Sequence, residues 1–410
     1  MEKDFSVEDA LERILAACQP LETIEVDSSA AHGEVLARDV IAPHALPPFA
    51  NSGMDGFAVR VADLAEASHE RPVTLPVAGV VQAGGTTVAV RTGTAVRIMT
   101  GAPLPEGAEA VVPIENVEAT ETHATFFELT TAGRHTRPAG EDVAEGAVAI
   151  PAGRLLRAAE IGLLAALGVN PVHVIRRPRV AIISTGDELV PAFDPAPLPP
   201  GKIRDANGPA LMAFVAEQGA QPLPLGVAHD THAALRAKLD EALQQGADLI
   251  LTSAGASAGD YDVVSGLMRE EDALEVWRVN LKPGRPLLFG RVGGGAQRAT
   301  PLLGLPGNPA SALIVAELFV KPAIARMRGL PHEQRVIVRA RLAEPQRGSE
   351  RRHYVRAWVE RDADGYHATT RGIGSGSGSL STLVKSNALL IIPENTGELP
   401  AGSVVDAMLL

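Results

Sequence analysis

The central part of the chain alternates short apolar runs with longer amphipathic segments. The apolar runs, each typical of a buried strand, are RVAIIS (179–184), PLPLGVA (222–228), ADLILTS (247–253), EVWRVN (275–280) and TPLLGL (300–305). The amphipathic segments, each typical of a helix, are GPALMAFVAEQG (208–219), DTHAALRAKLDEALQQG (230–246) and NPASALIVAELFV (308–320). Strands that alternate with helices imply right-handed crossovers and a mostly parallel sheet covered on both faces. The pattern therefore predicts a doubly wound, mostly parallel α/β domain over residues 179–328.

Other patterns flank this region. Residues 50–135 hold short β-prone runs broken by Gly and Pro, which predict a small β domain. Helical segments stand on either side of it, at 6–18 and 154–168, and if they pack together the β domain is an insertion. We therefore predict a multidomain α/β chain in four parts, namely residues 1–48 with 136–178 as a discontinuous helical linker domain, 49–135 as an inserted β domain, 179–328 as the α/β domain, and 329–410 as a C-terminal β-barrel-like domain.

Composition narrows the class of protein. A chain of 410 residues with 46% hydrophobic residues can form two to four packed domains. The net charge of −12 argues against a nucleic-acid partner, whose phosphates need a basic surface. The single cysteine, Cys18, excludes a disulfide framework and lies on an apolar helical face, which favours a buried structural thiol. With no signal peptide pattern and no run of about 20 apolar residues, we expect a cytoplasmic protein without membrane contact.

Polar or Gly-rich turns follow the apolar runs, at the strand ends where open α/β sheets bind ligands. The carboxylates there, which suit Mg²⁺, are Asp187, Glu188, Asp230, Asp260 and Asp262. The groups suited to a phosphate are Ser184, Thr185, Ser253, Ser257 and the backbone of Gly307 and Asn308. The nearby cations are Arg278, Lys282 and Arg285. Carboxylates beside a phosphate cradle and cations are the arrangement that phosphoryl or nucleotidyl chemistry uses.

Each of these residues also has a plainer interpretation. Asp187 is equally well placed as a turn residue, and Asp230 as a helix N-cap. Lys282 and Arg285 also fit solvated surface charges. The bulk-free stretch LTSAGASAGDYDVV (251–264) fits an ordinary surface loop, and the Gly/Ser run at 372–381 fits a flexible linker or a loop. HExxH and P-loop motifs are absent from the sequence, which disfavours a zinc protease and a P-loop enzyme.

Seven motifs together resemble those of the molybdopterin molybdenumtransferase family, which also resembles the C-terminal domain of gephyrin. The motifs are NSGMDGFAV (51–59), RIMTGAPLP (97–105), STGDEL (184–189), GKIRDAN (201–207), TSAGASAGDYD (252–262), LKPGRP (281–286) and LPGNPAS (305–311). They are spread over most of the chain. The resemblance implies an elongated homodimer of four-domain subunits that inserts molybdenum from molybdate into adenylylated molybdopterin, with Mg²⁺, and releases AMP. It also implies contact with a molybdopterin adenylyltransferase and with recipient molybdoenzymes.

The resemblance also implies roles for individual residues. Asp55 and Thr100 would reach the active site of the partner subunit. Glu188, Asp230 and Asp262 would serve metal and molybdate chemistry, with Lys282 holding anionic substrate. The residues implied to contact substrate are Ser184, Thr185, Gly186, Asp187, Ser253, Gly255, Ser257, Gly259, Arg278, Arg285, Pro306, Gly307, Asn308, Ser311, Arg351, Arg356 and Ser377.

The chain departs from the family pattern at a few of these positions. Ala254 replaces a Gly, Ala256 and Ala258 replace Val, and Arg278 and Arg285 stand where Lys is frequent. Arg keeps the charge and adds bidentate geometry, so a preference for tungstate over molybdate is an open alternative. Two other functions stay open: a molybdopterin adenylyltransferase activity, for which the extra domains are superfluous, and a non-catalytic gephyrin-like scaffold. Release of AMP from adenylylated molybdopterin on addition of molybdate separates the three.

Overall fold

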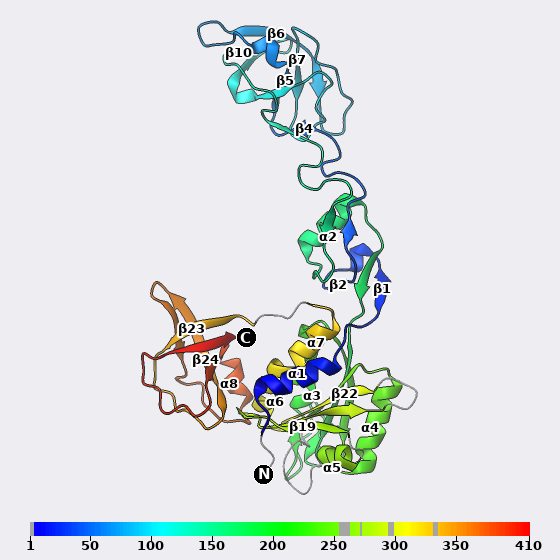
Figure 1. Cartoon of the computed structure of the whole chain (residues 1–410), viewed down its shortest axis with the longest axis vertical. Helices are drawn as coiled ribbons and strands as arrows, with labels where there is room; N and C mark the ends of the chain where they lie inside the picture. Colours follow the sequence, from blue (N-terminus) through cyan, green and yellow to red (C-terminus); the bar gives the residue numbers. More distant parts are fainter. Residues whose placement is uncertain (1–3, 254–262, 271–272, 294–298, 331–334) are drawn as a thin grey trace. The chain divides into compact units, whose positions relative to one another are not determined.

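The computed structural model of the chain describes residues 4–253, 263–270, 273–293, 299–330 and 335–410 (Figure 1). The chain divides into two compact units. The first comprises Met1–Ile24, Gly33–Ala37 and Val174–Leu410, and the second comprises Glu25–His32 and Arg38–His173. Within the described part of the chain, no helix is long and apolar enough to span a membrane.

The first unit contains the predicted α/β sheet, whose strand order is β17-β14-β18-β22-β21-β19. The strands are β14 (Arg179–Thr185), β17 (Gln221–Ala228), β18 (Leu249–Ser253), β19 (Leu274–Arg278), β21 (Pro286–Val292) and β22 (Thr300–Leu305). The pairs β14–β17, β14–β18 and β18–β22 are parallel, whereas β21 runs antiparallel to both β22 and β19. The mostly parallel sheet is therefore confirmed, and β21 is a strand that the sequence pattern did not predict.

Helices cover both faces of this sheet, as Figure 1 shows. They are α3 (Asn207–Glu217), α4 (His232–Gln244), α5 (Val263–Glu270) and α6 (Pro309–Val315), the last of which continues through the π-helical turn η4 (Ala316–Val320) into α7 (Lys321–Met327). Alternate residues of β14 enter different cores, because successive strand side chains point to opposite faces. Val180 and Ile182 pack with α3 and α6, while Ala181 and Ile183 pack with α4 and α5. The doubly wound prediction is confirmed.

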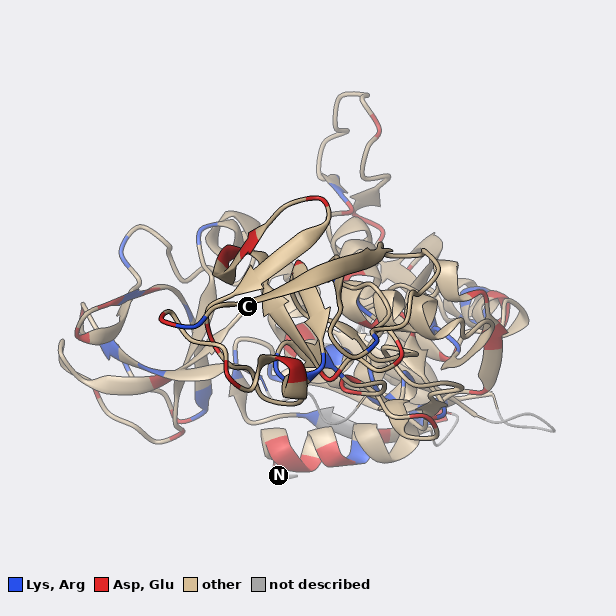
Figure 2. Ribbon diagram, turned by 90° about the horizontal axis from the view of Figure 1, so that it is seen from above, with Lys and Arg blue, Asp and Glu red and all other residues tan. Residues whose placement is uncertain are grey.

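The N-terminal helix α1 (Val7–Ala17) packs on the α/β domain. The Ser6 side chain caps it by accepting a hydrogen bond from the Asp9 N–H at 3.0 Å. Its apolar face, with Ile14 fully buried, joins the core formed by α7 and η4, and Cys18 is buried there as predicted. Packing of this helix against the helix at 154–168 stays a prediction. Its solvent side carries acidic residues, visible along α1 in Figure 2.

The C-terminal region forms a closed five-stranded barrel, as predicted. The sheet order is β20-β24-β25-β23-β27-β26, and an additional β24–β26 pairing closes the ring. The elements are β20 (Leu281–Lys282), β23 (Ile337–Leu342), β24 (Arg352–Asp362), β25 (Gly365–Thr369), α8 (Leu380–Val384), β26 (Ala388–Ile392) and β27 (Val404–Leu409). β20 comes from the segment between β19 and β21, so the α/β domain shares a parallel strand pair with the barrel.

The second unit contains the predicted β domain, a six-stranded sheet in the order β8-β5-β7-β6-β10-β9. Its elements are β4 (Asn51–Ser52), β5 (Gly56–Val59), η2 (Val61–Leu64), β6 (Val73–Val81), β7 (Ala95–Ile98), β8 (Ala110–Pro113), η3 (Ile114–Asn116), β9 (Val117–Ala119), β10 (His123–Phe126) and β11 (Thr136–Arg137). Phe57 and Phe126 meet edge to face in its core, with ring centroids 6.1 Å apart.

The remaining elements of the chain are short. They are β1 (Thr23–Val26), η1 (Ser28–Ala30), β2 (Val35–Leu36), β3 (Val40–Ile41), β12 (Val148–Ile150), α2 (Ala158–Leu167), β13 (Val172–Ile175), β15 (Leu189–Val190) and β16 (Ile203–Arg204). Helix α2 ends at Gly168, whose left-handed backbone (φ 64°) is the predicted C-cap. The proposed four-part division of the chain stays a prediction.

Candidate active site

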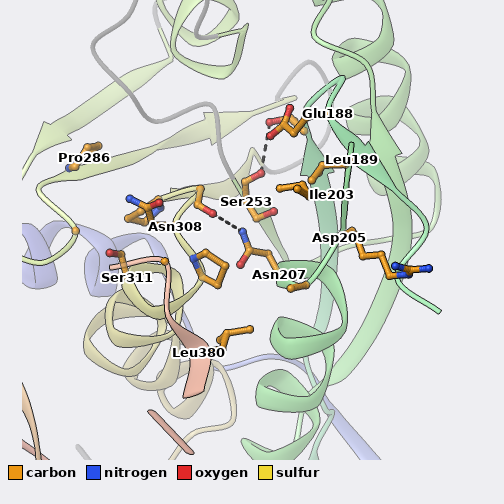
Figure 3. Close-up of a pocket in the computed structure, with 18 residues that line it drawn as sticks. Glu188, Leu189, Ile203, Asp205, Asn207, Ser253, Pro286, Asn308, Ser311 and Leu380 are labelled. Atoms are coloured by element: carbon orange, nitrogen blue, oxygen red, sulfur yellow. Dashed lines mark hydrogen bonds between the residues drawn. The ribbon is translucent and has the colours of Figure 1, made fainter. Parts of the chain in front are cut away.

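A cavity of about 710 Å³ opens where β14, β18 and β22 end (Figure 3). Seven of the predicted site residues line it, namely Thr185, Glu188, Ser253, Pro306, Gly307, Asn308 and Ser311. They come from three turns that are more than fifty residues apart in the sequence. Parallel strands bring such turns to one edge of a sheet, which is why the sequence could group them.

A buried chain of hydroxyl groups and a carboxylate lies beneath the cavity. The Ser253 hydroxyl donates to Ser184 Oγ at 3.2 Å, and the Ser184 hydroxyl donates to Asp205 Oδ2 at 2.8 Å. Asp205 Oδ1 accepts from the Gly208 N–H at 2.9 Å, and Asp205 itself lines the cavity. Sequence analysis missed Asp205, although it lies in the quoted GKIRDAN motif directly before α3. Ser184 is thus held inside the protein by its neighbours.

A hydrogen bond between the start of α3 and the turn before α6 joins two walls of the cavity. Asn207 Nδ2 donates to the Gly307 carbonyl at 2.8 Å, the contact drawn as a dashed line in Figure 3. Asn308 occupies the N-cap of α6, and Pro309 is its first residue, where the missing N–H costs nothing. Asn207 therefore fixes the Gly-Asn-Pro turn relative to α3.

The Gly/Ser run of residues 372–381 contributes to the same cavity. The Ser377 carbonyl accepts from the Ala310 N–H at 3.1 Å, and Gly378 and Leu380 line the cavity. The Gly376 carbonyl accepts from Arg356 Nη1 at 3.0 Å. These contacts tie the run to α6 and β24, so of the two plainer interpretations the run is a packed loop and not a flexible linker.

The STGDEL turn folds back on itself at the rim of the cavity. Gly186 has φ +146°, and a Cβ placed there would lie 2.6 Å from Glu188 Oε2. The Asp187 carboxylate is 2.8 Å from His229 Nδ1, and the Asp187 N–H donates to Asp230 Oδ2 at 3.2 Å. Hydrogen bonds from the His229 ring and the Asp230 N–H lower the pKa of Asp187. Asp187 thus organises the turn that presents Glu188 and Asp230.

The capping residue of α4 is Thr231. Its side chain accepts from the Ala234 N–H at 3.2 Å. The interpretation of Asp230 as the helix N-cap is therefore wrong.

Cations gather where β20 meets β24. Lys282 is exposed and pairs in register with His353, while Arg351 Nη1 donates to the Leu281 carbonyl at 3.3 Å. Burial, together with the positive charges of Lys282, Arg356 and Arg351, lowers the pKa of His353 to about 4. Burial also lowers the pKa of Arg356, whose Nε has no hydrogen-bond partner among the described residues. Sequence analysis missed His353.

The other two predicted cations differ in their surroundings. Arg285 donates from Nε and Nη2 to the two carboxylate oxygens of Asp4, at 2.8 and 3.1 Å. This pairing raises the pKa of Arg285 and neutralises its charge locally. Arg278 ends β19, and its carbonyl accepts from the Phe5 N–H at 2.9 Å. The N-terminal segment thus lies along the strand that precedes Lys282.

Asp55 and Thr100 lie together in the second unit. Asp55 Oδ1 accepts from the Thr100 N–H at 2.6 Å and from the Thr100 hydroxyl at 2.7 Å. These hydrogen bonds, first from the hydroxyl and then from the backbone, lower the pKa of Asp55. The two motifs that carry them, 51–59 and 97–105, therefore form one local structure.

Four predicted site residues, Gly255, Ser257, Gly259 and Asp262, lie outside the described residues, as does Asp260. In the part of the chain that is described, no group of three or more His, Cys, Asp or Glu side chains is placed to hold a metal ion. Of the three predicted metal-binding carboxylates, Glu188 and Asp230 lie within the described residues, in the same region as the carboxylates of Asp187 and Asp205.

Three family descriptions match successive parts of the chain. They are the MoeA N-terminal region (domain I and II) over residues 5–168, a probable molybdopterin binding domain over 181–326, and the MoeA C-terminal region (domain IV) over 339–410. Together they span nearly all of the sequence that carries the cavity, the cations and the Asp55–Thr100 pair.

Relatives match over comparable lengths. The chain is 40% identical over 402 residues to molybdopterin molybdenumtransferase 2 of Mycobacterium tuberculosis, covering 95% of each chain. It is 36% identical to the molybdopterin molybdenumtransferase of a Nostoc species, covering 94% of this chain and 88% of the relative. The crystal structure of the MoeA protein of Pyrococcus horikoshii OT3 superposes with a TM-score of 0.84 at 29% identity over 100% of both chains. The chain therefore belongs to the molybdopterin molybdenumtransferase (MoeA) family of molybdenum cofactor biosynthesis.

Proposed function

We propose that this protein inserts molybdenum from molybdate into adenylylated molybdopterin and releases AMP. The observation that carries the proposal is the cavity of about 710 Å³ at the strand ends, with Glu188 on its lining. It lies in the region similar to a molybdopterin binding domain. The relatives named above are molybdopterin molybdenumtransferases, and that activity needs a site large enough for a pterin and a nucleotide.

Mg²⁺ dependence is part of the proposal. Mg²⁺ is usually bound by one or two carboxylates together with waters and substrate phosphates, so Glu188 and Asp230 are a sufficient donor set without a third protein ligand. Asp262 is a further candidate. The bound ion would neutralise charge on the pyrophosphate bridge of the substrate.

The protein's own groups then bind and orient the anionic substrates. Lys282, Arg351 and Arg356 provide positive charge around His353, where β20 meets β24, in a chain whose net charge is −12. None of the predicted site residues is placed as a covalent nucleophile among the described contacts, so positioning and electrostatic stabilisation carry the catalysis. The Asp55–Thr100 pair of one subunit completes the site of the other in a homodimer.

The same proposal extends to the cellular setting. A cytoplasmic enzyme of this kind receives its substrate from a molybdopterin adenylyltransferase and passes its product to molybdoenzymes. Arg278 and Arg285 keep the charge of Lys but add bidentate hydrogen bonding, which can change the preference for molybdate or tungstate. Assays with both oxyanions measure this preference.

The test is a single-turnover assay. Purified protein is mixed with adenylylated molybdopterin and Mg²⁺, and AMP is measured before and after addition of molybdate or tungstate. We expect release that depends on the oxyanion, with Glu188→Gln slower by about 100-fold, the scale of losing one preorganised electrostatic group. Exposed Glu398→Gln is the matched control and should be unchanged. Consumption of ATP with molybdopterin would instead indicate an adenylyltransferase, and no reaction at all would indicate a scaffold.

A further inference from the structure

The Asp205 carboxylate is the buried polar group of the cavity to which the proposed chemistry gives no role. Asp205 is only 7% exposed, yet it lines the cavity. It accepts one hydrogen bond on each oxygen, from Ser184 and from the Gly208 N–H. A carboxylate has about four lone-pair sites, so it can accept further hydrogen bonds from a ligand.

The hydroxyl groups of Ser253 and Ser184 make the Asp205 carboxylate a hydrogen-bond acceptor. Ser253 donates to Ser184, and Ser184 donates to Asp205, so each hydroxyl hydrogen points toward the carboxylate. Asp205 is therefore the final acceptor of the chain, and it is held by donors on two sides. A ligand that hydrogen-bonds to it has to bring its own N–H or O–H donors.

An apolar surface lies next to this carboxylate. Leu189 and Ile203 are direct partners in the parallel pair β15–β16, so their side chains share one face. The Asp205 N–H donates to the Val190 carbonyl at 2.9 Å, which continues the ladder by one step. Alternate residues of an extended chain lie on the same face about 6–7 Å apart. Leu189, Ile203 and Asp205 all line the cavity. Arg204 also lines it, and its Nη2 donates to the carbonyls of Asp194 and Ala196 at 2.8 and 2.7 Å.

A flat apolar surface ending in a fixed acceptor suits a planar ring with donors at one edge. The 2-amino-4-oxopyrimidine ring of a pterin has such an edge, since its ring N–H and its 2-amino group are adjacent donors that a carboxylate can accept in parallel. Adenine places a donor beside an acceptor, which matches a carboxylate less well. We propose that Asp205 recognises the 2-amino-4-oxopyrimidine edge of the molybdopterin ring, with the ring lying on Leu189 and Ile203.

This inference rests on the proposed function, because it assumes a pterin substrate. Its test uses two competitors of the AMP-release assay, 6-hydroxymethylpterin monophosphate and the corresponding lumazine, in which a carbonyl replaces the 2-amino group. The wild-type protein should be inhibited by the pterin at a concentration at least tenfold lower than by the lumazine, since the lumazine turns an acceptor toward the carboxylate.

The matched variant is Asp205→Asn. Its amide offers one acceptor and one donor, which complement the N–H and carbonyl of lumazine, so the preference for the pterin should disappear or reverse. Asp194→Asn is the control. Asp194 is an exposed residue of the segment between β15 and β16, and it does not line the cavity. Its side chain accepts a hydrogen bond from the Ala196 N–H. That variant should keep the wild-type preference.

Several outcomes overturn the assignment. They are equal inhibition of the wild type by both compounds, inhibition by neither, or an unchanged preference in an Asp205→Asn variant with wild-type thermal stability. If that variant does not fold, the wild-type comparison alone decides. If the wild type releases no AMP, the proposed function fails separately, and calorimetric binding of the two compounds to the wild type still decides whether the cavity distinguishes them.

Discussion

His353 is a histidine that the fold keeps from taking a proton. Burial and the charges of Lys282, Arg356 and Arg351 hold its pKa at about 4, against 6.5 in an unfolded chain. Between these values the unfolded chain binds a proton that the folded protein does not, so stability falls as the pH drops from about 6.5 toward 4. We expect a loss on the order of 2 kcal/mol over this range.

This dependence is measured by thermal denaturation at about pH 7 and about pH 5, where the unfolded histidine changes charge. His353→Gln should lose less stability on acidification than the wild type. His123→Gln, at an exposed position of β10, is the control and should follow the wild type. Parallel curves for all three proteins would show that His353 titrates normally.

Lys282 tests the electrostatic part of the proposed function. Lys282→Gln should weaken binding of adenylylated molybdopterin by on the order of 1–3 kcal/mol, the scale of one hydrogen bond to a charged group. Lys385→Gln removes an equally exposed lysine at the end of α8 and should bind as the wild type does. Calorimetric titration measures both, and unchanged affinity in the first variant would make Lys282 a solvated surface charge.

The types of the site residues were predictable from the sequence, but several of their partners were not. Asp187 meets His229, which is 42 residues away, and Arg285 meets Asp4, which is 281 residues away. Short motifs identify carboxylates and cations because the residue type fixes the charge. Which charge is neutralised depends on tertiary contacts that no local pattern contains, as the pairing of Arg285 shows.

At the start of helix α4, neighbouring residues separate stability from function. Thr231→Ala removes the N-cap and should lower the free energy of unfolding by about 1 kcal/mol, with AMP release unchanged. Asp230→Asn should leave stability nearly unchanged and slow AMP release. Denaturant unfolding and the single-turnover assay are run on both variants, and the opposite pattern would return the capping role to Asp230.

The turn after β14 allows the effect of displacing Glu188 to be separated from the effect of backbone strain. Gly186→Ala should slow AMP release at least tenfold, because the added Cβ displaces the Glu188 carboxylate and the backbone has φ +146°. Gly226→Ala in β17 is the matched control. It also has a positive φ, of +75°, but nothing lies within 4 Å of its added Cβ. Comparable losses of activity in the two variants would assign the effect to backbone strain alone.

The strand that sequence analysis missed, β21, shows how residues typical of loops can conceal an element. β21 begins at Pro286 and contains Gly290, two residues that usually mark loops. Pro is tolerated at the first position of a strand, and a Cβ at Gly290 would lie 1.9 Å from the Ala273 carbonyl. Gly290 is therefore required by close packing against Ala273. Because Pro286 and Gly290 are both common in turns, the sequence of this strand resembles a turn.

At the scale of the whole molecule, a shared active site predicts complementation. Asp55→Asn and Glu188→Gln should each slow AMP release by about 100-fold. Refolding an equal mixture should restore about a quarter of the wild-type sites, because each mixed dimer has one site free of both changes. Light scattering checks the oligomeric state. A monomer, or a mixture that regains no activity, would contradict the shared site.

The contact between the Gly/Ser run and the cavity has a consequence for protein engineering. The Gly/Ser run lines the cavity with Gly378 and Leu380, which carry no polar side-chain group, and the Ser377 carbonyl accepts from the Ala310 N–H of α6. Side-chain size, more than side-chain chemistry, is therefore what substitution at this wall would change. A methyl group at Gly378 would come only into ordinary contact, 3.9 Å from Asn308 Oδ1. A series of variants with increasing side-chain volume at Gly378 would limit the size of the substrate that the cavity admits, without changing the polar groups of the cavity.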